Sequence, residues 1–62
     1  MHYLRSPGRE DLQHSSLAAA QEALGYMLKF NKGATDDGRG VWTFPSGVSV
    51  WITDEAGTIF PP

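Results

Sequence analysis

Residues 41–60, VWTFPSGVSVWITDEAGTIF, contain both tryptophans and the β-branched apolar residues of the chain. Within this stretch, the segments FPSGV (44–48) and DEAGT (54–58) each place two turn-compatible residues before a glycine. A three-residue hairpin loop is a type I turn followed by a left-handed residue, and glycine takes that position without a Cβ clash. We therefore predict three antiparallel strands joined as a meander, with Gly47 and Gly57 in the left-handed conformation.

The hairpin register assigns residues 41–60 to two faces of the predicted sheet. If both loops have three residues, Phe44 pairs with Val48, and alternate residues along each strand share a face. One face is then apolar throughout, and we expect it to receive a helix: Trp42, Phe44, Val48, Val50, Ile52 and Phe60. A two-residue loop would instead bring Trp42, Phe44 and Trp51 together, so the assignment depends on the three-residue loops.

The opposite face of this sheet carries Val41, Trp51 and Ile59, and we place Pro61 near Trp51. Tryptophan is enriched at binding hot spots because it offers a large rigid surface and one polar group. An exposed apolar patch of this kind needs an explanation. Either the amino terminus (residues 3–4) folds across the patch, or the patch contacts a partner protein or a second subunit.

Residues 15–30, SSLAAAQEALGYMLKF, predict the helix, because they are rich in alanine and leucine and follow a helical period. Ser15 or Ser16 is suited to cap its start, and Gly33 is suited to end it in a left-handed conformation. Winding the segment at 100° per residue gives one apolar stripe for the core: Leu17, Ala20, Leu24, Met27 and Leu28. A second stripe lies roughly opposite the first: Ala19, Ala23, Tyr26 and Phe30.

The second stripe has two interpretations. Tyr26 and Phe30 either fold round to the margin of the sheet or form a contact with a groove or helix of another molecule. In the second case Ala19 and Ala23 would allow close approach. We therefore count Tyr26 and Phe30, with Val41, Trp51 and Ile59, among the predicted partner-binding residues.

The remaining segments give weaker signals. Residues 1–5 alternate, with His2 and Leu4 on one side, and indicate either a short edge strand or an extended arm. Residues 33–40, GATDDGRG, predict a polar loop that is mobile unless something binds it. The predicted fold class is therefore α+β: one amphipathic helix packed on a three-stranded antiparallel meander, with residues 1–62 forming a single small domain.

Composition limits the functional classes. A chain of 62 residues has room for one small core and buries only about 60% of its unfolded surface. It has no cysteine, so no disulfide can add stability, and dimerisation is a common alternative. A net charge of -2 provides no general attraction to nucleic acid or to anionic membranes. No segment is apolar enough for a signal peptide or a membrane span, so we expect a complete, soluble, cytoplasmic protein.

Candidate chemical sites are sparse. The residue types of a hydrolytic triad occur close together in sequence: Asp11, His14, Ser15 and Ser16. No nucleophile-elbow pattern surrounds them, and sequence neighbours rarely hold triad geometry. His2 and His14 lack metal-ligand spacing, and residues 36–37, both aspartate, lack the alternating oxygen ligands of a calcium loop. We therefore expect no enzyme activity, no metal and no cofactor, and a solvated turn at residues 36–37.

The predicted order of elements resembles that of several small phage proteins that inhibit host defence complexes, including some anti-CRISPR proteins. The resemblance covers the whole chain in outline and lies in size and element order. Such inhibitors occlude a surface of a larger complex without catalysis. We accordingly favour a non-enzymatic protein-binding module, encoded by a phage or mobile element, that docks on a larger complex.

Two alternatives use other features of the chain. Lys29, Lys32 and Arg39 gather around the predicted helix end and the next loop, close in sequence to aromatic residues. Basic side chains beside sheet aromatics can bind single-stranded nucleic acid, which would make the protein a nucleic-acid accessory factor. The second alternative is a self-assembling structural protein, in which a homodimer interface covers the exposed apolar residues.

Overall fold

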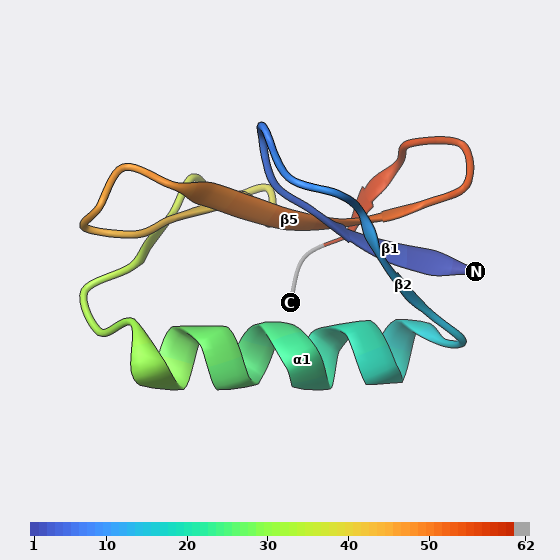
Figure 1. Cartoon of the computed structure of the whole chain (residues 1–62), viewed down its shortest axis with the longest axis horizontal. Helices are drawn as coiled ribbons and strands as arrows, with labels where there is room; N and C mark the ends of the chain where they lie inside the picture. Colours follow the sequence, from blue (N-terminus) through green and yellow to red (C-terminus); the bar gives the residue numbers. More distant parts are fainter. Residues whose placement is uncertain (61–62) are drawn as a thin grey trace.

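The computed structural model describes residues 1–60, which form one helix and six short strands. The elements are β1 (His2–Arg5), β2 (Leu12–His14), α1 (Leu17–Phe30), β3 (Thr35–Asp36), β4 (Trp42–Thr43), β5 (Ser49–Asp54) and β6 (Ile59–Phe60). The helix lies along one face of the antiparallel sheet (Figure 1). The α+β class is therefore confirmed, and the sheet is larger than the three strands predicted. The expectation for Pro61 lies outside the described residues.

The two predicted hairpins form in the predicted registers. In the first loop Phe44 N donates to Val48 O at 2.8 Å, and in the second Asp54 N donates to Thr58 O at 3.2 Å. Gly47 and Gly57 both have a φ of 89°, as three-residue loops of this type require. The register places Trp42 opposite Val50 and Phe60 opposite Ile52, as expected.

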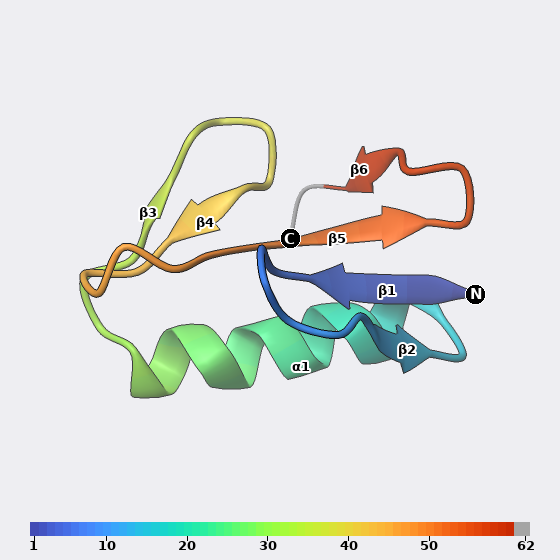
Figure 2. The ribbon, with the colours of Figure 1, turned by 45° about the horizontal axis from the view of Figure 1, so that its top comes forward.

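Strand β5 is the centre of the sheet, and its two edges are used differently. The strand order is β2-β1-β5-β4-β3, with β6 also paired to β5. The backbone N–H and C=O groups of consecutive residues in a strand point to opposite edges, so residues an even number of positions apart use the same edge. Val48 O bonds to the segment of β4, and Asp54 N bonds to the segment of β6. Because Val48 and Asp54 are an even number of positions apart, both bonds lie at the same edge. Consequently β4 and β6 lie one after the other along one edge of β5 (Figure 2), whereas a meander would place them on opposite edges.

The other edge of β5 is taken by the amino terminus. β1 pairs with β5 through residues 2–5, with Leu4 opposite Ile52. An amino-terminal strand was one of the two predicted outcomes, but its predicted position at the edge is wrong because β2 pairs with its outer side. The sequence did not indicate β2, since it has three residues and its one aliphatic side chain, Leu12, is exposed.

The core lies between α1 and the near face of the sheet. Its fully buried apolar residues are Leu4, Ala20, Leu24, Val50 and Ile52. Partly buried apolar side chains pack around them: Leu17, Ala23, Met27, Leu28, Trp42, Phe44 and Phe60. The predicted helix stripe and the predicted apolar sheet face therefore meet. This contact supplies the main hydrophobic stabilisation of the fold.

The ends of α1 follow the predicted signals. Ser16 caps the start, because its Oγ accepts a hydrogen bond from Ala19 N at 3.1 Å. Asn31 N donates to Met27 O at the carboxyl end, and Gly33 then adopts a φ of 91°. Within residues 1–60, no helix has the length and apolar character needed to cross a membrane.

The segment after the helix is more regular than predicted. Residues 35–36 form β3 and pair with β4, with Asp36 opposite Trp42. Asp36 Oδ1 also accepts hydrogen bonds from Gly38 N at 2.9 Å and Gly40 N at 3.2 Å. In place of the predicted irregular loop, the structure has a short strand and a turn held by an aspartate side chain.

Candidate protein-binding surface

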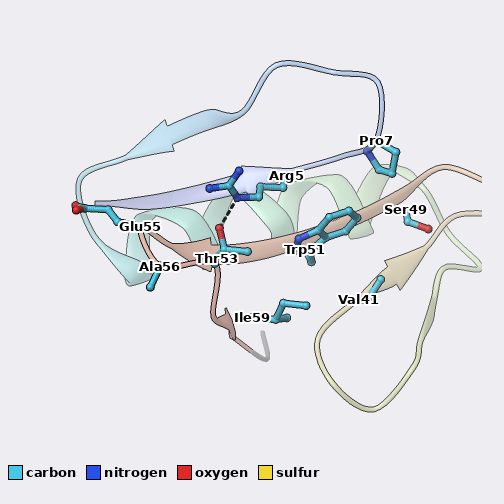
Figure 3. Close-up of a pocket in the computed structure, with 10 residues that line it drawn as sticks. Arg5, Pro7, Val41, Ser49, Trp51, Thr53, Glu55, Ala56 and Ile59 are labelled. Atoms are coloured by element: carbon cyan, nitrogen blue, oxygen red, sulfur yellow. Dashed lines mark hydrogen bonds between the residues drawn. The ribbon is translucent and has the colours of Figure 1, made fainter.

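The face of the sheet turned away from α1, here called the open face, carries a shallow groove centred on Trp51. Val41, just before β4, and Ile59, in β6, line the groove with Trp51 (Figure 3). They approach it from two strands because β4 and β6 follow each other along the same edge of β5. We call it the Trp51 groove. Other residues of the sheet and its loops also line it: Arg5, Pro7, Ser49, Thr53, Glu55, Ala56 and Gly57.

The apolar residues of the Trp51 groove match the predicted group on this face. Trp51 and Val41 are half-buried, and Ile59 is 38% exposed. Continuing the β4–β5 register by one residue puts Val41 opposite Trp51, as predicted. The structure therefore brings Val41, Trp51 and Ile59 together on one surface.

Arg5 forms a polar side of the Trp51 groove that the sequence analysis missed. It is the cross-strand partner of Trp51, and its Nε donates to Thr53 Oγ1 at 2.6 Å. Its Nη1 also bonds to Asp11 Oδ2 at 2.8 Å, and its guanidinium lies 5.2 Å from the centre of the Tyr3 ring. These contacts fix the long side chain beside Trp51.

The positions of residues 3–5 test the prediction that the amino terminus folds across Trp51. Leu4 does not lie on the open face, because it is in the core with 2% exposure. Tyr3 is on the open face but contacts Arg5, and neither Tyr3 nor Leu4 lines the Trp51 groove. The alternation of residues 1–5 already placed Tyr3 and Arg5 on one side. Only the pairing of β1 with β5 shows that this side adjoins Trp51.

Aspartate side chains hold the loops that flank the Trp51 groove. Asp54 Oδ1 accepts hydrogen bonds from Ala56 N and Thr58 N, both at 2.9 Å. Asp37 Oδ1 likewise accepts from Arg39 N at 2.7 Å and Val41 N at 3.3 Å. Each aspartate thus bonds the second and fourth residues after it, which orders both approaches to the groove.

The same hydrogen bonds affect the acidity of the two aspartates. The N–H of Thr58 is the main cause that lowers the pKa of Asp54 below its usual value. The N–H of Arg39 is the main cause that lowers the pKa of Asp37. A donated N–H favours the charged carboxylate, so these side chains remain ionised in more acidic solution than free aspartate.

The second group of predicted partner-binding residues lies on the far side of the helix. Tyr26 is 56% exposed and Phe30 is 78% exposed, so neither folds round to the sheet margin. Ala23, in contrast, packs against the core. The structure therefore separates Tyr26 and Phe30 from the Trp51 groove, which lies on the other side of the sheet.

The residues considered for catalysis and metal binding have other contacts. Asp11 bonds to Arg5, and Ser16 caps α1. His2 and His14 are cross-strand partners, and His2 Nδ1 and His14 Nε2 are buried without a hydrogen-bond partner in the described part of the chain. Within residues 1–60, no group of three or more histidine, aspartate or glutamate side chains is arranged to hold a metal ion.

The basic residues considered for nucleic-acid binding are all exposed. Lys29 lies on the outer side of α1, Lys32 follows the helix, and Arg39 is in the loop before β4. The neighbouring aromatic side chains, Trp42 and Phe44, pack against the core as predicted. The nucleic-acid hypothesis stays a prediction, and binding to oligonucleotides that weakens with added salt is its test.

Comparison of the chain with protein-family models, with curated proteins and with solved structures finds no match. The function is therefore inferred from the geometry of the chain itself.

Proposed function

We propose that the protein is a small, non-enzymatic protein-binding module whose partner docks on the Trp51 groove. The observation that supports this function is Trp51 itself, half-exposed between Val41 and Ile59 on a sheet face that no helix within residues 1–60 covers. Tryptophan contributes strongly to protein interfaces when it is held rigidly and flanked by apolar groups.

The surroundings of Trp51 favour binding because little has to be ordered when a partner arrives. Arg5 is held by Thr53 and Asp11, and the aspartate-bonded loops are ordered on both sides of the groove. A preorganised surface loses less conformational entropy on association than a mobile one. The apolar floor and polar side of the groove also match the usual anatomy of an interface, with an apolar centre and a polar rim.

The finer part of the proposal concerns how such binding would act. A protein of this size would block a surface of a larger complex by covering it. Inhibition of a host defence complex by a phage-encoded protein rests on the resemblance in size and element order described above. Its proposed site of action is the cytoplasm.

The proposal is tested with tagged full-length protein used to recover partners from cells. We expect Trp51→Ala to reduce recovery of the direct partner by about 30-fold, as for a hot-spot tryptophan. Tyr26→Ala, an aromatic substitution on the far side of α1, is the matched control and should retain that partner. Direct binding is then measured with the purified partner. Equal recovery of every partner by wild type and Trp51→Ala would contradict the proposal.

A further inference from the structure

The outer side of α1 has an exposed surface that the Trp51 groove does not use. Glu22, Gly25, Tyr26 and Lys29 line a shallow hollow there. At 100° per residue these four positions fall within an arc of about 100°. That arc lies opposite the side of α1 that is buried in the core through Ala20 and Leu24. Phe30, 78% exposed, borders the same surface.

We propose that this surface, here called the α1 outer surface, binds a second copy of the same chain in an antiparallel arrangement. The proposal goes beyond the function proposed for the Trp51 groove and does not depend on it. A two-fold axis between residues 25 and 26 would place each position i at the same height as position 51 − i of the other copy, and the two face each other directly where both lie near the centre of the arc. The same surface then serves both partners, as two-fold symmetry requires.

The charges on α1 favour this arrangement. Glu22 and Lys29 lie seven positions apart, or about 10.5 Å along the helix, too far to pair with each other. The ion pairs among residues 1–60 involve neither of them. In the antiparallel arrangement Glu22 of each copy faces Lys29 of the other, which gives two ion pairs. A parallel arrangement would place like charges together, so the charge pattern selects the antiparallel one.

The shape of the α1 outer surface has the same symmetry. Gly25 has no side chain, and a Cβ atom at this position would meet no atom of the described residues within 4 Å. Positions 25 and 26 lie at opposite edges of the arc, and the two-fold axis places each edge beside the same edge of the other copy, so Tyr26 lies next to Tyr26 of the second copy and Gly25 next to Gly25. The two tyrosine rings cover each other, and the two glycines, which each cost about 1 kcal/mol relative to alanine in a helix interior, let the helices approach closely along the other edge.

The contact is limited by the length of the helix. α1 has 14 residues and is about 21 Å long, so one helix pair covers less than the ~1,200 Å² of a standard interface. Interfaces below that size are typically weak and transient. We therefore expect a monomer–dimer equilibrium that becomes visible only at high protein concentration.

Sedimentation equilibrium of the full chain from about 10 µM to about 1 mM tests the proposal. Wild type should shift from monomer to dimer across this range. Tyr26→Ala should weaken the dimer at least tenfold. Glu22→Lys and Lys29→Glu should each weaken it roughly fivefold, since each converts two attractive pairs into two repulsive ones. Combining both reversals should restore the wild-type affinity within about twofold, because opposite charges again face each other.

Lys32→Glu is the matched control, since it changes the net charge as Lys29→Glu does but lies outside the pairing. It should leave the dimer unchanged. Thermal unfolding followed by circular dichroism confirms that each variant is folded, which exposed positions should allow. A monomeric mass at the highest concentration would overturn the proposal. So would a doubly reversed variant as weak as the single ones, or an equal loss in Lys32→Glu.

Discussion

The two faces of β5 differ in how their side chains are covered. Val50 and Ile52 face α1, and they are 3% and 0% exposed. Trp51 and Thr53 alternate with them on the open face, where no helix of the described part of the chain lies (Figure 1). Thr53 is nevertheless only 2% exposed, and it bonds to Arg5. One face is thus covered by a layer of secondary structure and the other by individual side chains.

Because of this difference, residues on the covered face should determine stability, and residues on the open face should determine binding. Apolar residues between α1 and the sheet contribute through burial, so their replacement costs the fold most. Residues of the open face are held by hydrogen bonds and by one cation–aromatic contact. A partner can therefore use Trp51 without disturbing the core.

Of the substitutions that test this comparison, Ile52→Ala should have the largest effect. Ile52 is fully buried, so we expect a loss of about 2–5 kcal/mol in the free energy of unfolding. Trp51→Ala, on the next residue but the other face, should cost less than ~2 kcal/mol because its side chain is half-exposed. Urea denaturation measures both. If the tryptophan substitution cost as much as the isoleucine substitution, the distinction between the faces would fail.

The second test concerns the turn that sets the register of the two faces. Gly47 has a φ of 89°, and a Cβ atom there would meet no atom of residues 1–60 within 4 Å. Gly47→Ala should therefore cost about 1–2 kcal/mol through backbone strain alone. Gly25→Ala provides a control with equal space but helical backbone, and should stabilise the monomer by up to ~1 kcal/mol. Both are measured by urea denaturation at low micromolar concentration, and an unchanged stability in Gly47→Ala would count against the predicted turn.

The smallest expected effect is an acid sensitivity of the loops that flank the Trp51 groove. The pKa values of Asp37 and Asp54 are lowered in the folded state by backbone N–H donors. Their stabilising contribution is present above the unfolded pKa of about 4 and is lost as the pH falls through the folded pKa. Urea unfolding between pH 7 and about pH 2.5 should show stability decreasing below about pH 4.

Asp54→Asn tests whether this acid sensitivity belongs to the loops. The amide keeps an oxygen acceptor but cannot titrate in this range. We expect the stability of the variant to depend less steeply on pH below about pH 4 than that of wild type. An unchanged slope would show that the acid sensitivity arises elsewhere.

The local sequence patterns contained enough information to exclude the meander that we predicted from them. The loop glycines correctly predicted both registers, and those registers place the bonding groups of Val48 and Asp54 on one edge of β5. Two hairpins on one edge cannot form a meander. The error therefore lay in combining the two hairpins, since each was predicted correctly by itself.

The sequence by itself determined the helix, its Ser16 cap, the core stripe and the placement of Trp51 on the open face. These features follow from turn chemistry and from periods of 3.6 and 2 residues, which act over short distances. Only the tertiary structure decided that β1 takes the free edge of β5 and that Arg5 borders Trp51. Such pairings depend on competition between segments that are far apart in the chain. The residue pattern of a strand of three or four residues is too short to predict which strand pairs with it.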